Sequence, residues 1–209
     1  MKKTLLLIFL VPVAFVTFAQ SPAIGITGGP SFAKFDFSGQ NISPVNSGLK
    51  ITFSMGIFAD FKFGNFSFRP TLNYTGRSGQ LTRENATISS ILYYAQVPLD
   101  LVYHVHSKAG TFYFGGGPYI AFGFSATDYL NDAEGNTNSM SQSFGGTDGE
   151  YSGTEVGLNA IAGLQFKSGL LIHINYDLGL TNALNNANFD NENLVINTRT
   201  LGISVGYVF

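Results

Sequence analysis

The side chains that could do chemistry here are ionisable residues separated by even numbers of positions within stretches of alternating polar and apolar residues. Nine of them fall on the polar positions of these alternating stretches and form a candidate polar network: Asp60, Arg69, Arg77, Asp100, His104, Glu155, Lys167, His173 and Asp177. With Lys50 and Lys62, and without the histidines, the set has five basic and four acidic members. A buried charge needs a partner, so this near-balance predicts a structural network of ion pairs. A narrow conducting channel is the alternative, although a pore lining more often carries one dominant sign.

Metal binding and catalysis find little support in the same residues. The three histidines, His104, His106 and His173, are expected near one end of the molecule, where a metal site is conceivable. Polar residues at the rim are the simpler interpretation, and we predict no metal or cofactor. The long connectors contain no histidine and the chain no cysteine, so a nucleophilic triad is hard to assemble. We predict that the protein is not an enzyme.

The segment 127–152 is acidic and carries no basic residue. Its acidic members are Asp128, Asp132, Glu134, Asp148 and Glu150. Richness in Asn, Ser and Gly predicts a solvated, mobile loop. We expect the protein to have a structural role or to dock an envelope or extracellular protein partner through this loop. Calcium binding is an alternative, but Asp132 and Glu134 lack the spacing of a known calcium loop.

The elements that must position these side chains have a period of two residues. From Leu170 to Thr181 the even positions are apolar or aromatic and the odd ones mostly polar or small, which indicates a two-faced strand. Gly28-Gly29-Pro30 blurs the parity of the first stretch and predicts a bulge there. Eight such stretches are found: 24–37, 49–63, 66–77, 91–105, 111–126, 156–167, 170–181 and 199–209.

The connectors between these stretches alternate between long and short. Short ones fall at 64–65, 106–110 and 168–169, and long ones at 38–48, 78–89, 127–152 and 182–196. This pattern is typical of outer-membrane barrels. The sequence therefore predicts an all-β fold, an eight-stranded antiparallel transmembrane β-barrel with up-and-down meander topology. Because eight is even, both termini are expected on the short-turn side, in the periplasm.

The composition fits a chain that hides half of each strand in lipid. Charged residues make up 11% of the 209 residues and apolar ones 44%, with 25 Gly, 20 Phe and no Cys. An average soluble domain has about 25% charged residues. A net charge of -2 gives no basic surface for nucleic acid. A soluble lipocalin-like ligand-binding barrel is the alternative; aromatic residues near the strand ends favour apolar faces turned outward to lipid.

Both ends of the sequence carry targeting signals. Lys2 and Lys3 precede an apolar run, and small residues before Gln20 suit cleavage, so 1–19 is predicted as a signal peptide and 20–209 as the barrel domain. The last stretch ends on Tyr207 and Phe209, like the signal that the barrel-assembly machinery recognises. That machinery and outer-membrane lipid are the partners expected during insertion.

Several strands resemble those of a known family. The stretch from Tyr94 to Tyr103, with Pro98-Leu99 at its centre, is similar to the Y-x-x-x-P-L-x-x-x-Y strand of PorT-like outer-membrane barrel proteins. Gly115-Gly116-Gly117-Pro118-Tyr119, residues 176–182 and residues 199–207 resemble later strands of that family. The resemblance implies a small barrel and offers no catalytic residues.

Overall fold

The computed structural model describes residues 21–38, 48–83, 86–132, 137–145, 151–183 and 195–209. The predicted signal peptide, 1–19, lies outside the described residues. All regular elements of the described part are strands: β1 (Ala23–Ser38), β2 (Lys50–Phe63), β3 (Phe66–Arg83), β4 (Ala86–His106), β5 (Gly110–Asp132), β6 (Thr137–Gln142), β7 (Thr154–Phe166), β8 (Leu170–Gly179) and β9 (Val195–Val208). No helix long and apolar enough to span a bilayer occurs among these residues.

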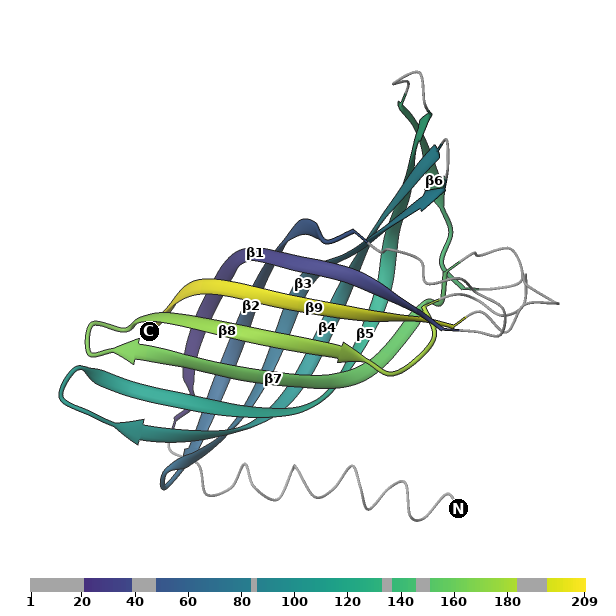
Figure 1. Ribbon diagram of the computed structural model, residues 1–209. Coiled ribbons are helices and arrows are strands. Elements are labelled where there is room, and N and C mark those ends of the chain that lie inside the picture. The colour runs from purple at the N-terminus through teal and green to yellow at the C-terminus, as the bar shows by residue number, and fades with distance from the viewer. Residues whose placement is uncertain (1–20, 39–47, 84–85, 133–136, 146–150, 184–194) are drawn as a thin grey trace, which may run out of the picture.

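Eight of the strands close into a barrel (Figure 1). Each strand from β1 to β5 pairs antiparallel with the next one, β7 follows β5, and β9 returns to β1. Closure leaves no free edge in the wall of the barrel. The predicted eight-stranded up-and-down barrel is confirmed. We call the end with the turns at 64–65, 107–109 and 167–169 the short-turn end, and the opposite one the long-loop end.

Three strands extend furthest beyond the predicted stretches. β3 reaches Arg83, β4 starts at Ala86 and β5 reaches Asp132, so much of the predicted connector 78–89 is strand. The predicted mobile loop 127–152 is also wrong in part, because β6 pairs with β5 from Ala126 to Asn131. Figure 1 shows these strands projecting beyond the barrel. Only a strand segment that faces lipid needs an alternating apolar face. The extensions of β3, β4 and β5 lie beyond the lipid-facing band, so the hydropathy pattern does not reveal them.

The predicted bulge in β1 is wrong, and the bulge lies in β5. The register of β1 with β2 advances without a step across Gly28-Gly29-Pro30. Tyr93 of β4 pairs with Ser125 of β5, but the next residue, Tyr94, pairs with Gly123. Phe124 of β5 is therefore an extra residue. An extra residue exchanges the two faces of a strand. Beyond it, Ala126 and Asp128 therefore turn inward and are buried.

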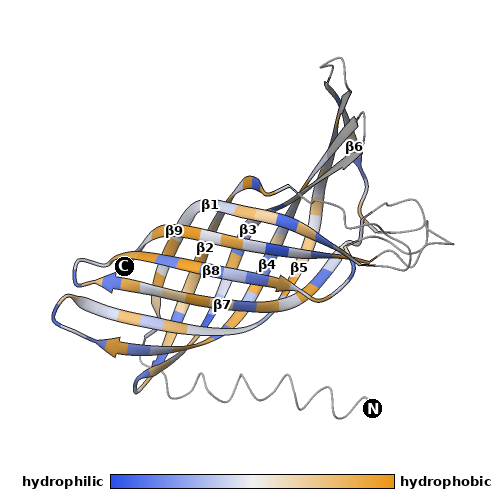
Figure 2. Ribbon diagram, in the orientation of Figure 1, coloured by the Kyte–Doolittle hydropathy of each residue, from blue (hydrophilic) through white to orange (hydrophobic). Residues whose placement is uncertain are grey.

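The apolar faces of the strands point outward and the polar faces inward. Ile57, Leu72 and Ile174 each expose half or more of their surface, whereas Arg77 and Gln96 are fully buried. Apolar residues recur on alternate positions of the wall in Figure 2. A soluble barrel of lipocalin type would place these faces the other way round, so this arrangement contradicts that alternative. An eight-stranded barrel is just wide enough for side chains to fill it.

Two glycines of β7 make room for inward tyrosines. A Cβ atom on Gly163 would lie 2.6 Å from the ring of Tyr113, and one on Gly157 would lie 2.5 Å from the ring of Tyr119. Both distances are well below contact, so the rings rest directly on the glycine backbone. These flat surfaces allow two bulky side chains to fit within the narrow interior.

Candidate functional site

The first polar layer of the interior lies toward the short-turn end. Arg69 on β3 contacts Asp60 on β2 through two nitrogens, with Nη2 2.9 Å from Oδ2 and Nε 3.3 Å from Oδ1. Its guanidinium lies over the rings of Phe58 at 4.7 Å and Tyr113 at 4.5 Å. Both ion-pair partners are almost completely buried. The two-point contact and the flanking rings fix Arg69 in one position.

The two inward histidines belong to this layer. Nε2 of His104 lies 2.8 Å from the hydroxyl of Ser67 and 3.8 Å from Oδ2 of Asp60. Nδ1 of His173, which is half-buried, lies 3.3 Å from the hydroxyl of Tyr113. His106 is exposed at the rim. Within the described ranges, no three His, Cys, Asp or Glu side chains form a group that could hold a metal ion.

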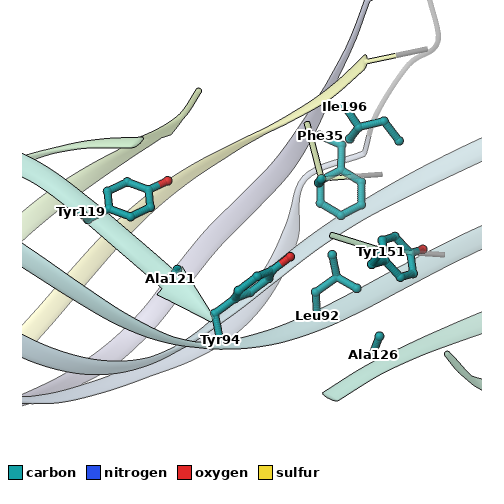
Figure 3. Close-up of a cluster of buried hydrophobic side chains, with 9 residues drawn as sticks. Phe35, Leu92, Tyr94, Tyr119, Ala121, Ala126, Tyr151 and Ile196 are labelled. Carbon is teal, nitrogen blue, oxygen red and sulfur yellow. The ribbon is translucent and has the colours of Figure 1, made fainter. Parts of the chain in front are cut away.

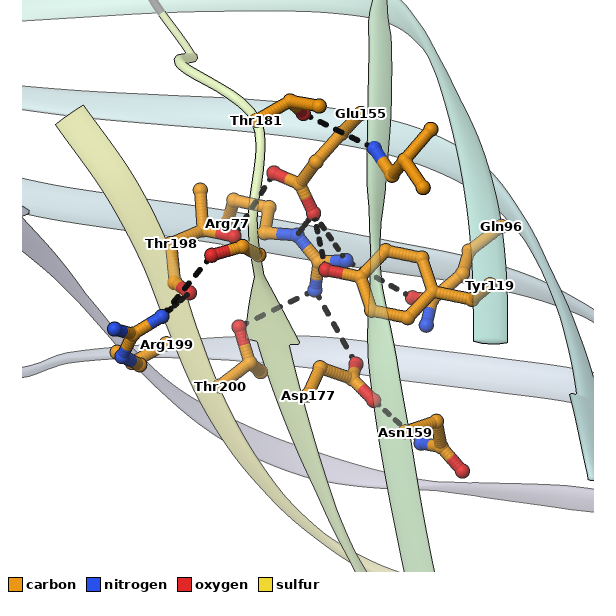
Figure 4. A network of polar contacts seen from close by, with 12 residues as sticks. Arg77, Gln96, Tyr119, Glu155, Asn159, Asp177, Thr181, Thr198, Arg199 and Thr200 are labelled. Carbon is orange, nitrogen blue, oxygen red and sulfur yellow. Dashed lines mark hydrogen bonds and ion pairs between the residues drawn. The ribbon is translucent and has the colours of Figure 1, made fainter. Parts of the chain in front are cut away.

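The second polar layer centres on Arg77 of β3 (Figure 4). Its guanidinium lies 3.0 Å from Oε1 of Glu155 and 3.3 Å from Oδ2 of Asp177. It also donates to Gln96 Oε1 at 3.1 Å and Thr200 Oγ1 at 3.2 Å. Four strands besides β3 thus supply its partners. One fully buried cation ties together the walls of the barrel.

Glu155 is held by two further contacts of the same layer. The Tyr119 hydroxyl donates to its Oε1 at 2.6 Å, and the Thr198 hydroxyl donates to its Oε2 at 2.8 Å. The Arg77 guanidinium lies between the rings of Tyr94 and Tyr119, 5.7 and 5.4 Å from their centroids. The carboxylate and the cation are therefore both saturated with partners, which is what a buried pair needs to be stable.

An apolar cluster closes the interior above this layer, toward the long-loop end (Figure 3). Its members are Phe35, Leu92, Tyr94, Tyr119, Ala121, Ala126, Tyr151, Ala183 and Ile196, with Phe144 packed against them. The rings of Phe144 and Tyr94 meet edge to face at 5.5 Å. Phe144 and Tyr151 come from the connection between β6 and β7, so this connection folds back onto the mouth of the barrel.

The structure distributes the predicted network residues over three environments. Asp60, Arg69, Arg77, Asp100, His104, Glu155 and Asp177 are buried in the interior. His173 is half-buried, and Lys167 is exposed in the turn after β7. Lys62 is also exposed at that rim, and Lys50 is half-buried near the other end. Lysines near strand ends extend their ammonium groups to water, so Lys167 is not part of the buried network.

This placement overturns the expected balance of charge. Among the predicted residues that are buried, two arginines face four carboxylates, whereas the prediction had five basic and four acidic members. Lys62 and Lys167 instead line an open cavity of about 570 Å³ at the short-turn mouth, together with His106. Among these predicted residues, the interior proper therefore holds more acidic than basic side chains.

Several partners in the network were missed from the sequence. Tyr113 and Tyr119 are aromatic, a residue type common at lipid borders, and were not among the predicted members. Gln96, Asn159, Thr198 and Thr200 carry no charge and did not stand out. Their positions could have identified them, because each of the six lies on the inward-facing alternate positions of its strand.

The hairpin of Ala126–Asn131 and Thr137–Gln142, here named the outer hairpin, lies beyond the barrel. β6 occupies the edge of β5 that β7 leaves free above Phe122. Asp128 accepts hydrogen bonds from Gln142 Nε2 and from the Tyr151 hydroxyl, each at 3.0 Å. These contacts fasten the base of the hairpin to the barrel. Glu134, Asp148 and Glu150, the other acidic residues of the predicted docking segment, lie outside the described residues.

The residues predicted as an assembly signal lie at the short-turn end. The backbone amide of Phe209 donates to the carbonyl of Ile24 at 2.9 Å. The rings of Tyr207 and Phe209 meet edge to face at 5.5 Å, and both are exposed on the outer surface. β9 thus presents an aromatic pair beside β1, where the barrel closes.

Known proteins share this architecture. Residues 18–185 match the model of the outer membrane protein beta-barrel domain family, and no curated protein sequence matches the chain. Among solved structures, Ail of Yersinia pestis, in complex with the heparin analogue sucrose octasulfate, is 14% identical over 91% of this chain and 100% of its own, with a TM-score of 0.44.

Two further structures are similar. OprG of Pseudomonas aeruginosa is 11% identical over 91% of this chain and 97% of its own, with a TM-score of 0.45. Neisserial surface protein A is 13% identical over 89% of this chain and 97% of its own, with a TM-score of 0.43. The family match spans well over half of the sequence and agrees with the closed barrel and its outward apolar faces. The chain is an outer-membrane β-barrel and belongs to the outer membrane protein beta-barrel domain family.

Proposed function

We propose that this protein is a filled, non-enzymatic barrel that docks a protein partner at the cell surface through the outer hairpin. The observation that carries the proposal is the outer edge of β6. Among the described strands, β6 pairs with β5 alone and ends the sheet. Its six residues, TNSMSQ, include no charge and no proline, the features by which proteins usually block an exposed edge. Such an edge accepts an added strand from a partner.

The sidedness follows from the loops. In outer-membrane barrels the short turns lie in the periplasm and the long loops outside the cell. We therefore assign the short-turn end, with Ala23 and Val208, to the periplasm. We also retain the PorT-like resemblance of residues 94–103 as a proposal about the closer relationship.

The docking proposal is tested by crosslinking at the edge. A photoreactive residue at Met140, which is 57% exposed, should give a discrete adduct in intact cells. Ser139→Lys with Ser141→Lys places charges on the β6 edge, and we expect the adduct yield to fall about tenfold, or ~1.4 kcal/mol. Thr154→Lys, on a strand paired on both sides, is the matched control and should leave the adduct unchanged. An adduct that survives both edge lysines would refute docking by strand addition.

The filled interior argues against the alternative of a narrow channel. Arg77, Glu155 and Tyr119 occupy the middle of the barrel, and the apolar cluster lies above them. We expect flat current traces from the wild-type protein in planar bilayers. Deleting the plugging side chains in Tyr119→Ala with Phe144→Ala should create stepwise conductance. Wild-type traces with reproducible unitary steps would favour transport instead.

A further inference from the structure

The interior between the two polar layers contains a cavity with unpaired oxygen atoms. Its volume is about 40 Å³, and its lining is mostly hydroxyl, amide and carboxylate groups. At roughly 10–15 Å³ for each water-sized site, it has room for about three such sites. Asp100 and Asn159 both line the cavity and are more than nine-tenths buried. The Oδ1 atom of each has no hydrogen-bond partner in the structure.

The pairing of the strands explains why Asp100 is left over. The register places Asp100 on β4 directly opposite Arg69 on β3. The Arg69 guanidinium turns instead to Asp60 on β2, at 2.9 Å. Asp177, the other carboxylate of the cavity, accepts from Arg77 and from Nδ2 of Asn159. With its nitrogen bound to Asp177, the Asn159 amide oxygen points away from that carboxylate (Figure 4).

The charge around the cavity points to a cation. Of the charged residues that line the cavity, Asp100 and Asp177 are acidic and Arg69 is basic, and Arg69 is already paired with Asp60. One divalent ion beside them would offset the charge of these two lining carboxylates. Carboxylate, amide and hydroxyl oxygens are the ligands of hard cations, and calcium tolerates an irregular oxygen set completed by water.

We propose that this cavity binds one calcium-sized divalent cation, with Asp100 Oδ1 and Asn159 Oδ1 as direct ligands and Asp177 beside them. The positive charge of Arg69, which also lines the cavity, is already engaged by Asp60. The proposed ion links β4, β7 and β8 across the interior. It stabilises the folded barrel because the unfolded chain does not assemble these ligands.

The test is to refold the full chain in detergent with calcium or with a chelator, remove free ion, and measure bound calcium and the urea midpoint of unfolding. We expect about one calcium per chain and a higher midpoint with calcium. Asp100→Asn preserves the shape and removes the charged ligand, so bound calcium and the midpoint shift should both be lost. Asp36→Asn, at a half-exposed rim pair, is the matched control and should retain both.

Two results would overturn the site. Wild-type protein refolded in millimolar calcium that retains no ion and shows no midpoint shift would exclude it. Calcium that is retained equally by Asp100→Asn would belong to the acidic residues of 127–152 instead. The wild-type measurement decides the first point even if the variant fails to refold.

Discussion

Replacing Arg77 by methionine is expected to lower the free energy of unfolding of the barrel by about 3–5 kcal/mol. The fully buried guanidinium contacts Glu155 at 3.0 Å and Asp177 at 3.3 Å. Methionine fills much of the same volume but leaves both carboxylates without a counter-charge in a closed interior. Urea unfolding in lipid vesicles, followed by the heat-modifiable shift on gels, measures the loss.

Two companion variants identify the cause of that loss. Arg77→Met combined with Glu155→Gln and Asp177→Asn removes the unpaired charges, and it should recover most of the stability. Arg199→Met breaks an ion pair at the rim, in which the Arg199 side chain is 23% exposed and that of Asp36 is 42% exposed. This change should lower the free energy of unfolding by less than about 1 kcal/mol. If Arg77→Met cost no more than Arg199→Met, the central role of the network would be wrong.

Gly163→Val is expected to destabilise the barrel by about 1–3 kcal/mol. The new side chain would meet the Tyr113 ring and the backbone carbonyl of Ile172, each 2.6 Å from the added Cβ. Tyr113 cannot yield freely, because it lies against the Arg69 guanidinium. The displacement should therefore also weaken the pair between Arg69 and Asp60. The same vesicle unfolding assay measures the change.

Ala160→Val on the same strand is the matched control for this variant. Ala160 faces outward and is exposed, so the larger side chain meets lipid and should leave the unfolding midpoint almost unchanged. Equal effects of the two valines would show that the strand, and not the fit of Tyr113 on Gly163, sets the cost.

The barrel itself could be predicted because its physics is repeated in every strand. A strand between lipid and a narrow interior must alternate, as Leu170 to Gly179 does. Beyond the bilayer that demand ends, and the continuation of β3, β4 and β5 and the presence of β6 left no trace in the hydropathy pattern. The bulge at Phe124 depends on how two strands match, which one strand's sequence does not reveal.

The sequence identified most of the charged residues of the interior, but it did not show which of them contact one another. Parity identified Arg77, Glu155 and Asp177 as inward residues, while their meeting depends on the stagger of β3, β7 and β8 around the ring. It also counted Lys62 and Lys167 as inward, since parity does not register how far a residue lies from the rim. That error concealed the excess of acidic over basic side chains among the buried predicted residues and, with it, a reason to look for a cation.

The length of β5 has a mechanical consequence. The strand runs from Gly110 to Asp132 with one bulge at Phe124, paired with β4 along most of its length, with β7 below and with β6 above. Antiparallel hydrogen bonds lie perpendicular to the strands, so a pull on the outer hairpin along the strand direction loads many of them in shear at once. A surface attachment at β6 would thus transmit tension directly into the barrel wall, and it would resist detachment better than a hairpin joined by a flexible tether.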